Sequence, residues 1–451
     1  MQSAENPEAR GLEVAVVGSG ISGLSAAWLL SKRHRVTLYE ADARLGGHSN
    51  TVDVGCGAVD TGFIVYNEAT YPNFSALLEY LGVATKTSDM TFAVSLDDGR
   101  LEYSGTGVTG LFAQPRNAVS PRFWGMLRDL VRFYREAPHA TRDLGDTSLD
   151  AYLDASGYGV AFRADHLYPM AAAIWSTPAA EIGEYPARAF VRFCENHGLL
   201  KLTNRPLWRT LAGGSRAYVE KLAKAIPEIL TSTAISAVRR HPDCVEIVSR
   251  AGESRRFDQV VLATHADQAL AMLADPTAGE KRLLGAFAYC ANKAVLHSDA
   301  TLMPRRRRVW SSWNYLSSDR GDSRRLAVTY WMNRLQGLPN AKPIFLTLNA
   351  HRPIREESVL YATDYTHPIF NARAMNAQSQ LWSLQGERST WFCGAYFGAG
   401  FHEDGLQAGL AVAEALGGSR RPWVVANESD RIFMSEPKVS NARATACLEV
   451  A

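Results

Sequence analysis

The chain has 451 residues, of which 46% are hydrophobic and 21% are charged, a composition typical of a globular protein with two or three domains. Its 48 basic and 46 acidic residues leave a net charge of +2, so a globally basic nucleic-acid binder is excluded and no nucleic-acid partner is expected. No run of 18 apolar residues occurs, so no membrane-spanning helix is predicted. The six scattered cysteines form no CxxC pair, and the polar N-terminus is unlike a secretory signal. We therefore expect a cytoplasmic protein without disulfides or a metal site.

The first elements predict a dinucleotide-binding unit. Leu12–Val17 is a short apolar run typical of a buried parallel strand, and a Gly-x-Gly-x-x-Gly turn follows at Gly18–Gly23. An Ala- and Leu-rich helix is predicted over Leu24–Leu30, then a strand over Val36–Tyr39 that ends in Glu40. Strand, glycine turn, helix, strand and acid occur in the order that this fold requires.

Each position of this motif has a physical role. Gly18 allows a tight turn, Gly20 lets the backbone approach a pyrophosphate, and Gly23 permits close packing of helix and strand. The N–H groups of the helix start, at Ile21 and Ser22, offer donors to phosphate. Glu40 is placed to accept from ribose hydroxyls, which argues against NADP. The alternative is a glycine turn that binds nothing.

The residues after Glu40 distinguish FAD from NAD. Arg44 can donate to phosphate, and Gly46-Gly47 let the backbone pass close to an extended cofactor. Such a second motif is absent from domains that bind only NAD. The sequence therefore predicts FAD.

A partner motif lies near the other end of the chain. A strand is predicted over 389–393, a glycine-rich turn over Gly394–Gly400, and a helix over 406–416 after His402-Glu403. The start of this helix can point at the flavin ring and stabilise the negative charge of its reduced form.

The middle of the chain adds further pieces of the same fold. A helix is predicted over 217–225, and strands over 229–238, 245–248 and 257–263. Together these elements predict an α/β fold with a Rossmann-like FAD-binding domain and an inserted α+β substrate domain. The FAD-binding domain is assigned to residues 11–66, 208–275 and 386–420, the substrate domain to 67–207 and 276–385, and a C-terminal extension to 421–451.

Several motifs together resemble a known family. The E-x-x-x-R-x-G-G stretch at Glu40–Gly47 and F-C-G-A-Y-F-G-A-G-F-H-E-D-G at Phe392–Gly405 look like those of the flavin-containing amine oxidase superfamily. D-T-G-F-I-V-Y-N at Asp60–Asn67 and N-H-G-L-L at Asn196–Leu200 are similar to a bacterial branch of predicted NAD/FAD-binding proteins. The resemblance runs from about residue 12 to 418. It implies FAD contacts at Gly18, Gly20, Ile21, Ser22, Gly23, Glu40, Ala41, Arg44, Gly46, Gly47, His48, Thr61, Gly62, Phe63, Val238, Gly394, Phe401, His402, Glu403 and Leu406.

That branch includes flavin-dependent fatty-acyl phospholipid desaturases of furan fatty acid synthesis. The resemblance therefore implies that the protein desaturates a lipid acyl chain by hydride transfer to flavin N5. Two alternatives remain open, an amine or polyamine oxidase that releases hydrogen peroxide, and a flavin-binding protein without redox activity. No acid that would recognise a substrate ammonium can be assigned, which favours an apolar substrate over a simple amine.

Candidate catalytic residues are fewer. In the superfamily a lysine often stands near flavin N5, and strand alternation predicts that Lys293 faces the flavin, the alternative being a lysine in solvent. Tyr396 could form one wall of an aromatic cage. Cys393 could form a thioether to flavin, although a small buried residue is the simpler reading. Candidate bases for the second proton of a desaturation are His402, Glu403, Tyr330, His351, Tyr365 and His367.

The strongest charge run is Arg305–Arg308, followed by Trp310. Such a run is either a solvated face or a contact with anionic lipid headgroups. In the second interpretation it forms a basic rim at the pocket mouth, and the protein lies at the inner face of the cell membrane.

Overall fold

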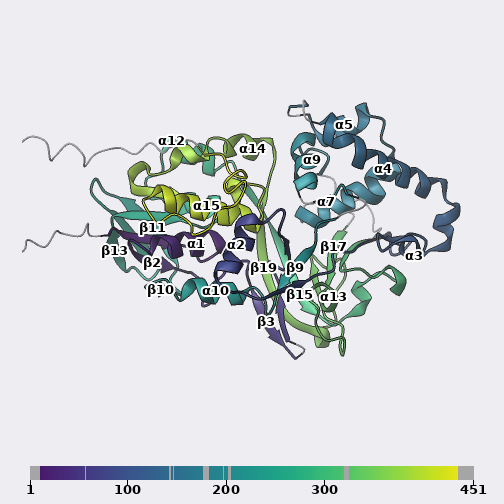
Figure 1. Cartoon of the computed structure of the whole chain (residues 1–451), viewed down its shortest axis with the longest axis horizontal. Helices are drawn as coiled ribbons and strands as arrows, with labels where there is room; N and C mark the ends of the chain where they lie inside the picture. The colour runs from purple at the N-terminus through teal and green to yellow at the C-terminus, as the bar shows by residue number, and fades with distance from the viewer. Residues whose placement is uncertain are drawn as a thin grey trace, which may run out of the picture.

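The computed structural model describes residues 11–55, 57–141, 144–145, 147–175, 182–196, 198–201, 205–318 and 325–434. The polar segment 1–10, residue 197 of the Asn196–Leu200 motif and the tail 435–451 lie outside the described residues. Figure 1 shows a body with α1 and α15 on one side and a group of helices that includes α4, α5, α7 and α9 on the other. Long strands connect the two sides.

A five-stranded parallel sheet forms the first side, as predicted. Its order is β10 (Glu228–Leu230), β2 (Arg35–Tyr39), β1 (Glu13–Val17), β14 (Gln259–Leu262) and β20 (Thr390–Phe392). The Val-rich strands β1 and β14 are buried almost throughout, because helices cover a parallel sheet on its faces. Neighbouring strands come from stretches of the chain separated by up to 245 residues, as in the pair Val14 and Gln259.

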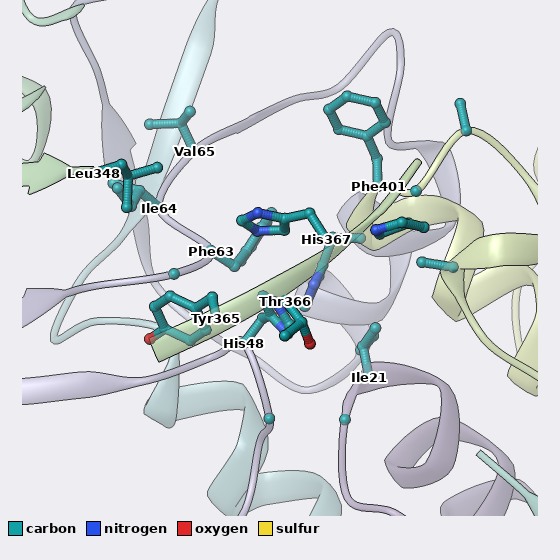
Figure 2. A pocket seen from close by; sticks show the side chains of 18 of the residues that line it. Ile21, His48, Phe63, Ile64, Val65, Leu348, Tyr365, Thr366, His367 and Phe401 are labelled. Atoms are coloured by element: carbon teal, nitrogen blue, oxygen red, sulfur yellow. The ribbon is translucent and has the colours of Figure 1, made fainter. Parts of the chain in front are cut away.

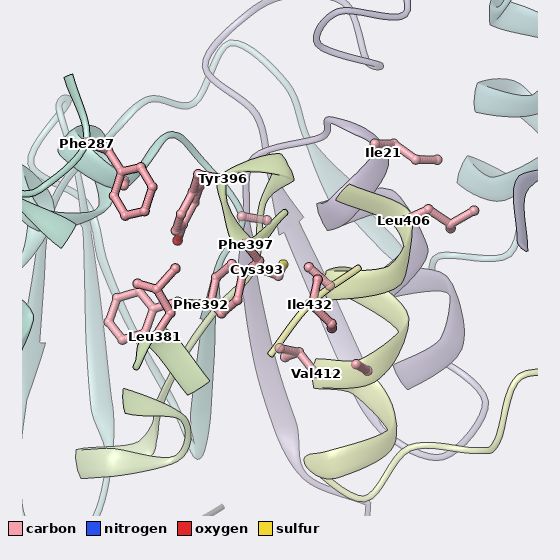
Figure 3. Packing of buried hydrophobic residues seen from close by; sticks show 14 of the residues in the cluster. Ile21, Phe287, Leu381, Phe392, Cys393, Tyr396, Phe397, Leu406, Val412 and Ile432 are labelled. Atoms are coloured by element: carbon pink, nitrogen blue, oxygen red, sulfur yellow. The ribbon is translucent and has the colours of Figure 1, made fainter. Parts of the chain in front are cut away.

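Two helices lie in unusually close contact beside this sheet. They are α1 (Ile21–Leu30) and α15 (His402–Ala415). A Cβ placed on Gly409 would lie 2.2 Å from the carbonyl oxygen of Ser22, and one on Gly405 would lie 2.8 Å from the Ser22 hydroxyl. Glycine at these two positions therefore lets α15 approach α1. Figure 3 shows Leu406 and Val412, which are buried side chains of α15, together with the buried side chain of Ile432.

Several of the predicted elements differ from those observed. The strand predicted over 257–263 consists of the last residue of β13 (Ser254–Phe257) and, after residue 258, the strand β14. The strand predicted over 229–238 is two strands, β10 and β11 (Ile235–Arg240), separated by a turn in which Ser232 has φ +53°. β11 leaves the parallel sheet and pairs with β12 (Val245–Ser249), which pairs with β13 (Ser254–Phe257). The helix predicted over 406–416 begins four residues earlier, at His402.

A seven-stranded mixed sheet forms the base of the other side. Its strands are antiparallel except for one parallel pair, β16 with β7. The order is β19 (Val359–Ile369), β15 (Ala288–His297), β18 (Phe345–Leu348), β17 (Arg325–Trp331), β16 (Trp313–Ser318), β7 (Phe92–Leu96) and β8 (Leu101–Ser104). The two longest strands, β15 and β19, pair along ten residues and run between the two sides of the molecule (Figure 1).

Helices lie above the mixed sheet in Figure 1. They belong to one stretch of chain and comprise α3 (Val108–Leu111), α4 (Pro121–Ala140), α5 (Leu149–Ala155), α6 (Val160–Phe162), α7 (Tyr168–Trp175) and α9 (Ala187–Asn196). The remaining short elements are β3 (Thr51–Val54), β4 (Gly57–Asp60), β5 (Tyr66–Asn67), α2 (Pro72–Tyr80), β6 (Thr85–Thr87), β9 (Trp208–Leu211), α10 (Arg216–Ala223), α11 (Ala266–Met272), α12 (Ala278–Leu284), α13 (Met332–Leu335) and α14 (Ala372–Gln378).

The segment 421–434 after α15 has neither helix nor strand, yet it is firmly packed. Trp423 stacks on Trp28 of α1 with ring centroids 6.0 Å apart. The buried Arg421 donates to Glu414 and to the side chain of Asn73 in α2. This part of the predicted C-terminal extension thus joins α1, α2 and α15. In the described part of the chain, no helix is long and apolar enough to cross a membrane.

Candidate active site

One cavity of about 1780 Å³ extends from the glycine turn after β1 to the helices above the mixed sheet. Figure 2 shows part of its wall, with Ile21 and Phe401 on one side, His48, Tyr365 and His367 near the centre, and Ile64, Val65 and Leu348 on the other side. Residues far apart in the sequence therefore face one space.

The geometry of the glycine turn is compatible with the three roles that the sequence predicts. Gly18 has φ +101°, and a Cβ there would lie 2.7 Å from the carbonyl oxygen of Ala263, directly after β14. A Cβ on Gly20 would meet no atom within 4 Å, whereas one on Gly23 would lie 1.8 Å from the carbonyl oxygen of Gly18. Gly20 thus leaves open space for a pyrophosphate in front of α1, and Gly23 serves packing instead of lining the cavity.

Glu40 lies at the end of β2, where the sequence places the ribose acid. Its carboxylate accepts the backbone N–H of Ser19 at 2.9 Å and the N–H of Asp42 at 2.9 Å. Glu40, Ala41 and Asp42 all line the cavity. These bonds hold the carboxylate beside the glycine turn, in the position from which it can accept from a ribose hydroxyl.

The predicted second motif crosses close to the first. A Cβ on Gly47, which has φ +55°, would lie 3.1 Å from the Cα of Gly20. Gly46, Gly47 and His48 line the cavity, but Arg44 does not. The Nη1 atom of Arg44 is buried without a hydrogen-bond partner among the described residues. An unpaired buried guanidinium N–H is rare, and it fits a site that a phosphate completes.

Thr61, Gly62, Phe63 and His402 form the next part of the wall. The rings of Phe63 and His402 stack with centroids 3.8 Å apart. His402 Nε2 lies 2.8 Å from the hydroxyl of Tyr218, and burial lowers the pKa of His402 to about 3. His402 is therefore a neutral, hydrogen-bonded side chain at the start of α15.

Three further histidines gather near the centre of the cavity. The ring centroid of His48 lies 5.4 Å from that of His367 and 6.2 Å from that of His265. Burial lowers the pKa of all three, that of His367 to about 4. The Nε2 atom of His48 is buried without a partner in the described structure. Since no group of three His, Cys, Asp or Glu side chains among the described residues has a metal-binding arrangement, these histidines form a neutral polar wall.

Beyond this wall the cavity continues along α4 as an apolar limb. Trp124, Leu127, Leu130, Val131 and Tyr134 line it, and most of them share one helix face because they stand three or four residues apart. Trp124 and Leu207 are exposed members of this lining, at 52% and 60%. Arg205 and Leu207 lie at the same lining. Of the described residues that line the cavity, Glu40 and Asp42 are the only acids.

Two strand residues are not where the sequence predicts them. Lys293 is exposed and does not line the cavity; its alternation with Asn292 is as predicted, but the face that carries Lys293 is the solvent face. Val238 is buried and its carbonyl accepts from the N–H of Ala274. Ile235 and Ser236 line the cavity in its place, at a register shift in β11.

Two residues of α15 also lie away from the cavity. Glu403 is fully buried, and its carboxylate accepts the backbone N–H of Asn73 at 3.0 Å and of Phe74 at 2.9 Å. It therefore caps α2, which has no side-chain cap of its own. Leu406 is buried in the core beside α1 and does not line the cavity (Figure 3).

The turn before α15 contributes wall residues and core residues. Gly394 and Phe401 line the cavity, and so does Tyr396. Figure 3 shows Tyr396 next to Phe287 and Phe397; its hydroxyl is buried without a partner among the described residues. Cys393 is buried outside the cavity, and burial raises the pKa of its thiol. The simple reading of Cys393 as a small core residue therefore fits the structure.

The candidate bases are divided by their positions. Tyr330, Tyr365, His367 and His402 line the cavity, whereas His351 and Glu403 do not. Arg305–Arg308 do not line it either; Arg306 pairs with the buried Glu102, and the half-buried Trp310 packs against Trp331 and Phe345. The run therefore lies outside the lining of this cavity, and its contact with anionic lipid headgroups stays a prediction.

Sequence reasoning missed the residues contributed by α4 and, in β19, Thr366, although it named Tyr365 and His367 of the same strand. The apolar spacing of Trp124, Leu127, Val131 and Tyr134 is visible in the sequence and could have indicated a helix face. Thr366, His265 and Arg205 carry no comparable signal, because only the tertiary fold brings them to the cavity.

Comparison with known proteins shows the family. The model described as flavin containing amine oxidoreductase matches residues 21–296, more than half of the chain. A stretch of 279 residues is 25% identical to (S)-6-hydroxynicotine oxidase of Paenarthrobacter nicotinovorans, and it covers 60% of this chain and 64% of that enzyme. The match thus spans less than two thirds of that relative's length.

Solved structures show the same fold at low identity. The CLA-producing fatty acid isomerase from P. acnes aligns with a TM-score of 0.64 at 15% identity, over 92% of this chain and 99% of the other. Wild-type putrescine oxidase bound to putrescine aligns with a TM-score of 0.65 at 13% identity, over 90% and 99%. The predicted fold, an FAD-binding Rossmann-like unit with an inserted substrate part, is confirmed. The chain therefore belongs to the flavin-containing amine oxidoreductase family, and its cofactor is FAD.

Proposed function

We propose that the protein is an FAD-dependent oxidoreductase that desaturates an acyl chain of a membrane lipid. The observation that carries the proposal is the apolar limb along α4, which leads from an exposed end at Trp124 to the neutral polar wall around His48 and His367. The absence of acids from the described lining beyond Glu40 and Asp42 supports an uncharged, apolar substrate.

The chain's residues fit FAD at the other end of the cavity. The open space at Gly20, the held carboxylate of Glu40 and the unpaired Nη1 of Arg44 suit its pyrophosphate and ribose. When bound, FAD supplies the acceptor for the hydride that leaves one C–H bond. A base among the lining side chains, of which the neutral His402 is a candidate, would take the proton of the neighbouring carbon, so that one C=C bond forms and two electrons leave the chain. Phe63, stacked on His402, helps to exclude water from this region.

The dimensions of the limb suit a long chain. Trp124 and Tyr134 stand ten residues apart on α4, which corresponds to about 15 Å along a helix. Each CH₂ group that enters the limb contributes about 0.8 kcal/mol. A chain of several CH₂ groups can therefore be held by apolar contact alone, without a charged anchor next to the oxidised carbon. The CLA-producing fatty acid isomerase from P. acnes has the same fold, which supports this substrate class.

The surroundings of the limb's outer end support entry from an anionic lipid surface. Val108 and Val119 are 72% and 81% exposed, and Trp124 is 52% exposed. The indole of Trp124 donates to the carbonyl of Ala118, so Trp124 lies next to the segment that carries Val119. Residues 105–135 contain five arginines and a single acid, Asp129, which is buried. Exposed apolar side chains between arginines are typical of a surface that binds anionic headgroups.

The decisive experiment is anaerobic bleaching of the bound flavin by phospholipids extracted from bacterial membranes. We expect loss of the oxidised flavin absorption together with a new double bond in the lipid, detected by mass spectrometry. Leu127→Glu should block this bleaching without lowering flavin content, because Leu127 lines the limb far from the glycine turn. Val424→Glu is the matched control, since Val424 is 94% exposed and lies outside both the lining and residues 105–135. Bleaching by no lipid preparation would contradict the proposal.

Membrane contact is tested separately by sedimentation with vesicles that contain anionic lipid at low salt. Replacing Arg116 and Arg128 by Gln should reduce binding, and high salt should remove the difference. The matched control replaces Arg305, Arg307 and Arg308 by Gln, which lie outside the cavity lining. Equal sedimentation of all three proteins would contradict contact through α4, and a loss confined to the control would favour the run at Arg305–Arg308.

Amine oxidation is the second candidate, because (S)-6-hydroxynicotine oxidase and putrescine oxidase are similar to this chain. Tyr396 lies at the cavity wall, where one side of an aromatic cage would be. Release of hydrogen peroxide with a panel of amines, and no bleaching by lipids, would favour this function. A flavin that no lipid and no amine bleaches would favour a binding role without redox activity.

A further inference from the structure

A line of hydrogen bonds connects the surface of β18 and β15 to His367 in the cavity. It starts at the backbone N–H of Lys293, which donates to Asn349 Oδ1 at 3.0 Å. Asn349 Nδ2 then lies 2.7 Å from Asn292 Oδ1, and Asn292 Nδ2 lies 2.9 Å from His367 Nδ1. We propose that Asn349 and Asn292 hold His367 in one tautomer, with its proton on Nε2, so that the cavity receives a hydrogen-bond donor instead of a base.

The direction of the first bonds follows from the backbone. A backbone N–H can only donate, so the group of Asn349 that faces Lys293 must be its oxygen. The amide nitrogen of Asn349 therefore faces Asn292, and because that nitrogen also only donates, it must meet the oxygen of Asn292.

A second backbone group fixes Asn292 independently. Its Nδ2 lies 3.2 Å from the carbonyl oxygen of Cys290, and a carbonyl can only accept. The two ends of the line thus require the same orientation of the Asn292 amide. His367 Nδ1 faces this NH₂ group and must accept with its lone pair. In a neutral imidazole the proton is then on Nε2.

The surroundings of His367 keep the ring neutral. The ring lines the cavity, and the ring of His48 is its neighbour (Figure 2). Burial, with a smaller contribution from His265, lowers the pKa of His367 to about 4. At neutral pH the two ring nitrogens therefore share a single proton. The position of that proton decides whether the ring offers the cavity a hydrogen-bond donor or an acceptor.

Backbone strain marks the start of the line. Asn349 has φ +52°, a conformation that few residues other than glycine adopt, although Asn tolerates it better than most. Its backbone N–H also donates to the carbonyl of Lys293 at 2.9 Å, so it holds both polar groups of that residue. Strain of this kind persists where the surrounding structure requires it, and it is frequent at functional sites.

An Nε2–H donor recognises an oxygen or nitrogen acceptor that enters this part of the cavity. A carbonyl of FAD and an ester carbonyl of a lipid both have this chemistry. The inference concerns the chain's own residues and holds whether the substrate is a lipid or an amine. Asn292 and Asn349 act through His367 and are positioning residues.

The test is long-range proton–nitrogen NMR of the FAD-loaded protein with ¹⁵N-labelled histidine. The His367 signals are assigned by their loss in His367→Gln, or in His367→Phe if the first variant does not fold. We expect a protonated Nε2 and an unprotonated Nδ1 in the wild-type protein at pH 7.5. A protonated Nδ1, or exchange between both tautomers, would overturn the proposal without any variant of the line being needed.

Asn292→Asp reverses the polarity next to the ring. A carboxylate only accepts, so we expect the proton of His367 to appear on Nδ1 in this variant. Lys293→Gln is the matched control, because its exposed side chain changes while the backbone N–H that starts the line remains. An unchanged Nε2 proton in Asn292→Asp would contradict the role of the line.

The acceptor is identified by two further comparisons. If the donor faces FAD, the absorption spectrum of bound flavin should shift in His367→Phe and stay closer to wild type in His367→Gln, which keeps an N–H group. If it faces the substrate, the Nε2 signal should move only when lipid is added under anaerobic conditions. If removal of the donor changes neither the flavin spectrum nor any lipid-dependent signal, the cavity does not use this donor.

Discussion

Gly20 and Gly23 lie in one turn, but their surroundings are opposite. A Cβ on Gly20 enters open space at the cavity, and a Cβ on Gly23 meets the carbonyl oxygen of Gly18. Gly20→Val should therefore fold and purify without flavin, whereas Gly23→Val should lose thermal stability before any effect on flavin is measurable. The ratio of flavin to protein absorbance and the unfolding midpoint distinguish the two. A fully loaded Gly20→Val protein would contradict the placement of the cofactor.

Glu40 offers a milder test of the same region. Glu40→Ala removes the acceptor that a ribose hydroxyl would use, so we expect FAD binding to weaken by about 1–3 kcal/mol, the scale of one hydrogen bond to a charged group. The measurement is titration of flavin-depleted protein with FAD. Asp42→Asn is the control, because Asp42 also lines the cavity but lies beyond the ribose acid. Equal loss in both variants would indicate a general charge effect.

At the level of single residues, the motifs predicted the positions that the local geometry of a strand, a turn and a helix determines. Gly18, Gly20 and Glu40 stand where the spacing places them, since the turn and the following strand leave little freedom. Lys293 and Val238 do not line the cavity as predicted, and the reason is physical. Alternation along a strand identifies two faces without telling which is buried, and the register shift in β11 moves the lining from Val238 to Ile235.

Among the elements, α2 depends on a side chain from another helix. Glu403 accepts the N–H groups of Asn73 and Phe74, so Glu403→Ala should leave both donors unpaired in a buried place. We expect a loss of about 2–6 kcal/mol of stability, because each of the two buried unsatisfied groups costs about 1–3 kcal/mol. Denaturant unfolding measures it. The flavin content of the folded protein should stay unchanged, and a selective loss of flavin would instead support the predicted cofactor contact.

The helix α4 shows what element-level prediction could not reach. Its apolar spacing is evident in the sequence, but apolar spacing usually means burial in a core. Here part of that face lines a cavity, because α4 lies above the mixed sheet without filling the space between them. Whether an apolar face meets side chains or a hollow depends on how distant segments pack, and one segment's sequence does not encode it.

For the whole molecule, buried histidines predict acid sensitivity. Burial lowers the pKa of His166 and of His297 to about 4, from an ordinary value of 6.5. Below pH 6.5 the unfolded chain therefore binds protons that the folded chain does not, so stability falls as pH decreases towards 4. Each of the two contributes a loss of about 3 kcal/mol over this range.

Urea unfolding at pH 7.5, 6 and 5 checks this dependence. His297→Gln removes one of the two titrations, so its stability should fall less steeply with decreasing pH than that of the wild type. The buried His297 is distant in sequence from the glycine motifs and does not line the cavity, so flavin loading should not confuse the comparison. Parallel curves for both proteins would contradict the assignment.

The long sequence separations within the parallel sheet have a consequence for how the protein is made. During synthesis, β1, α1 and β2 leave the ribosome early. The partner strand β14 is made much later, since Val14 of β1 pairs with Gln259 of β14, 245 residues along the chain. β20 and α15 follow only after residue 389. Contacts between such distant segments form slowly. Until α15 arrives, α1 lacks the helix that packs against Ser22. A nascent chain stalled before β20 is therefore expected not to retain flavin, although its glycine turn and Glu40 are already complete.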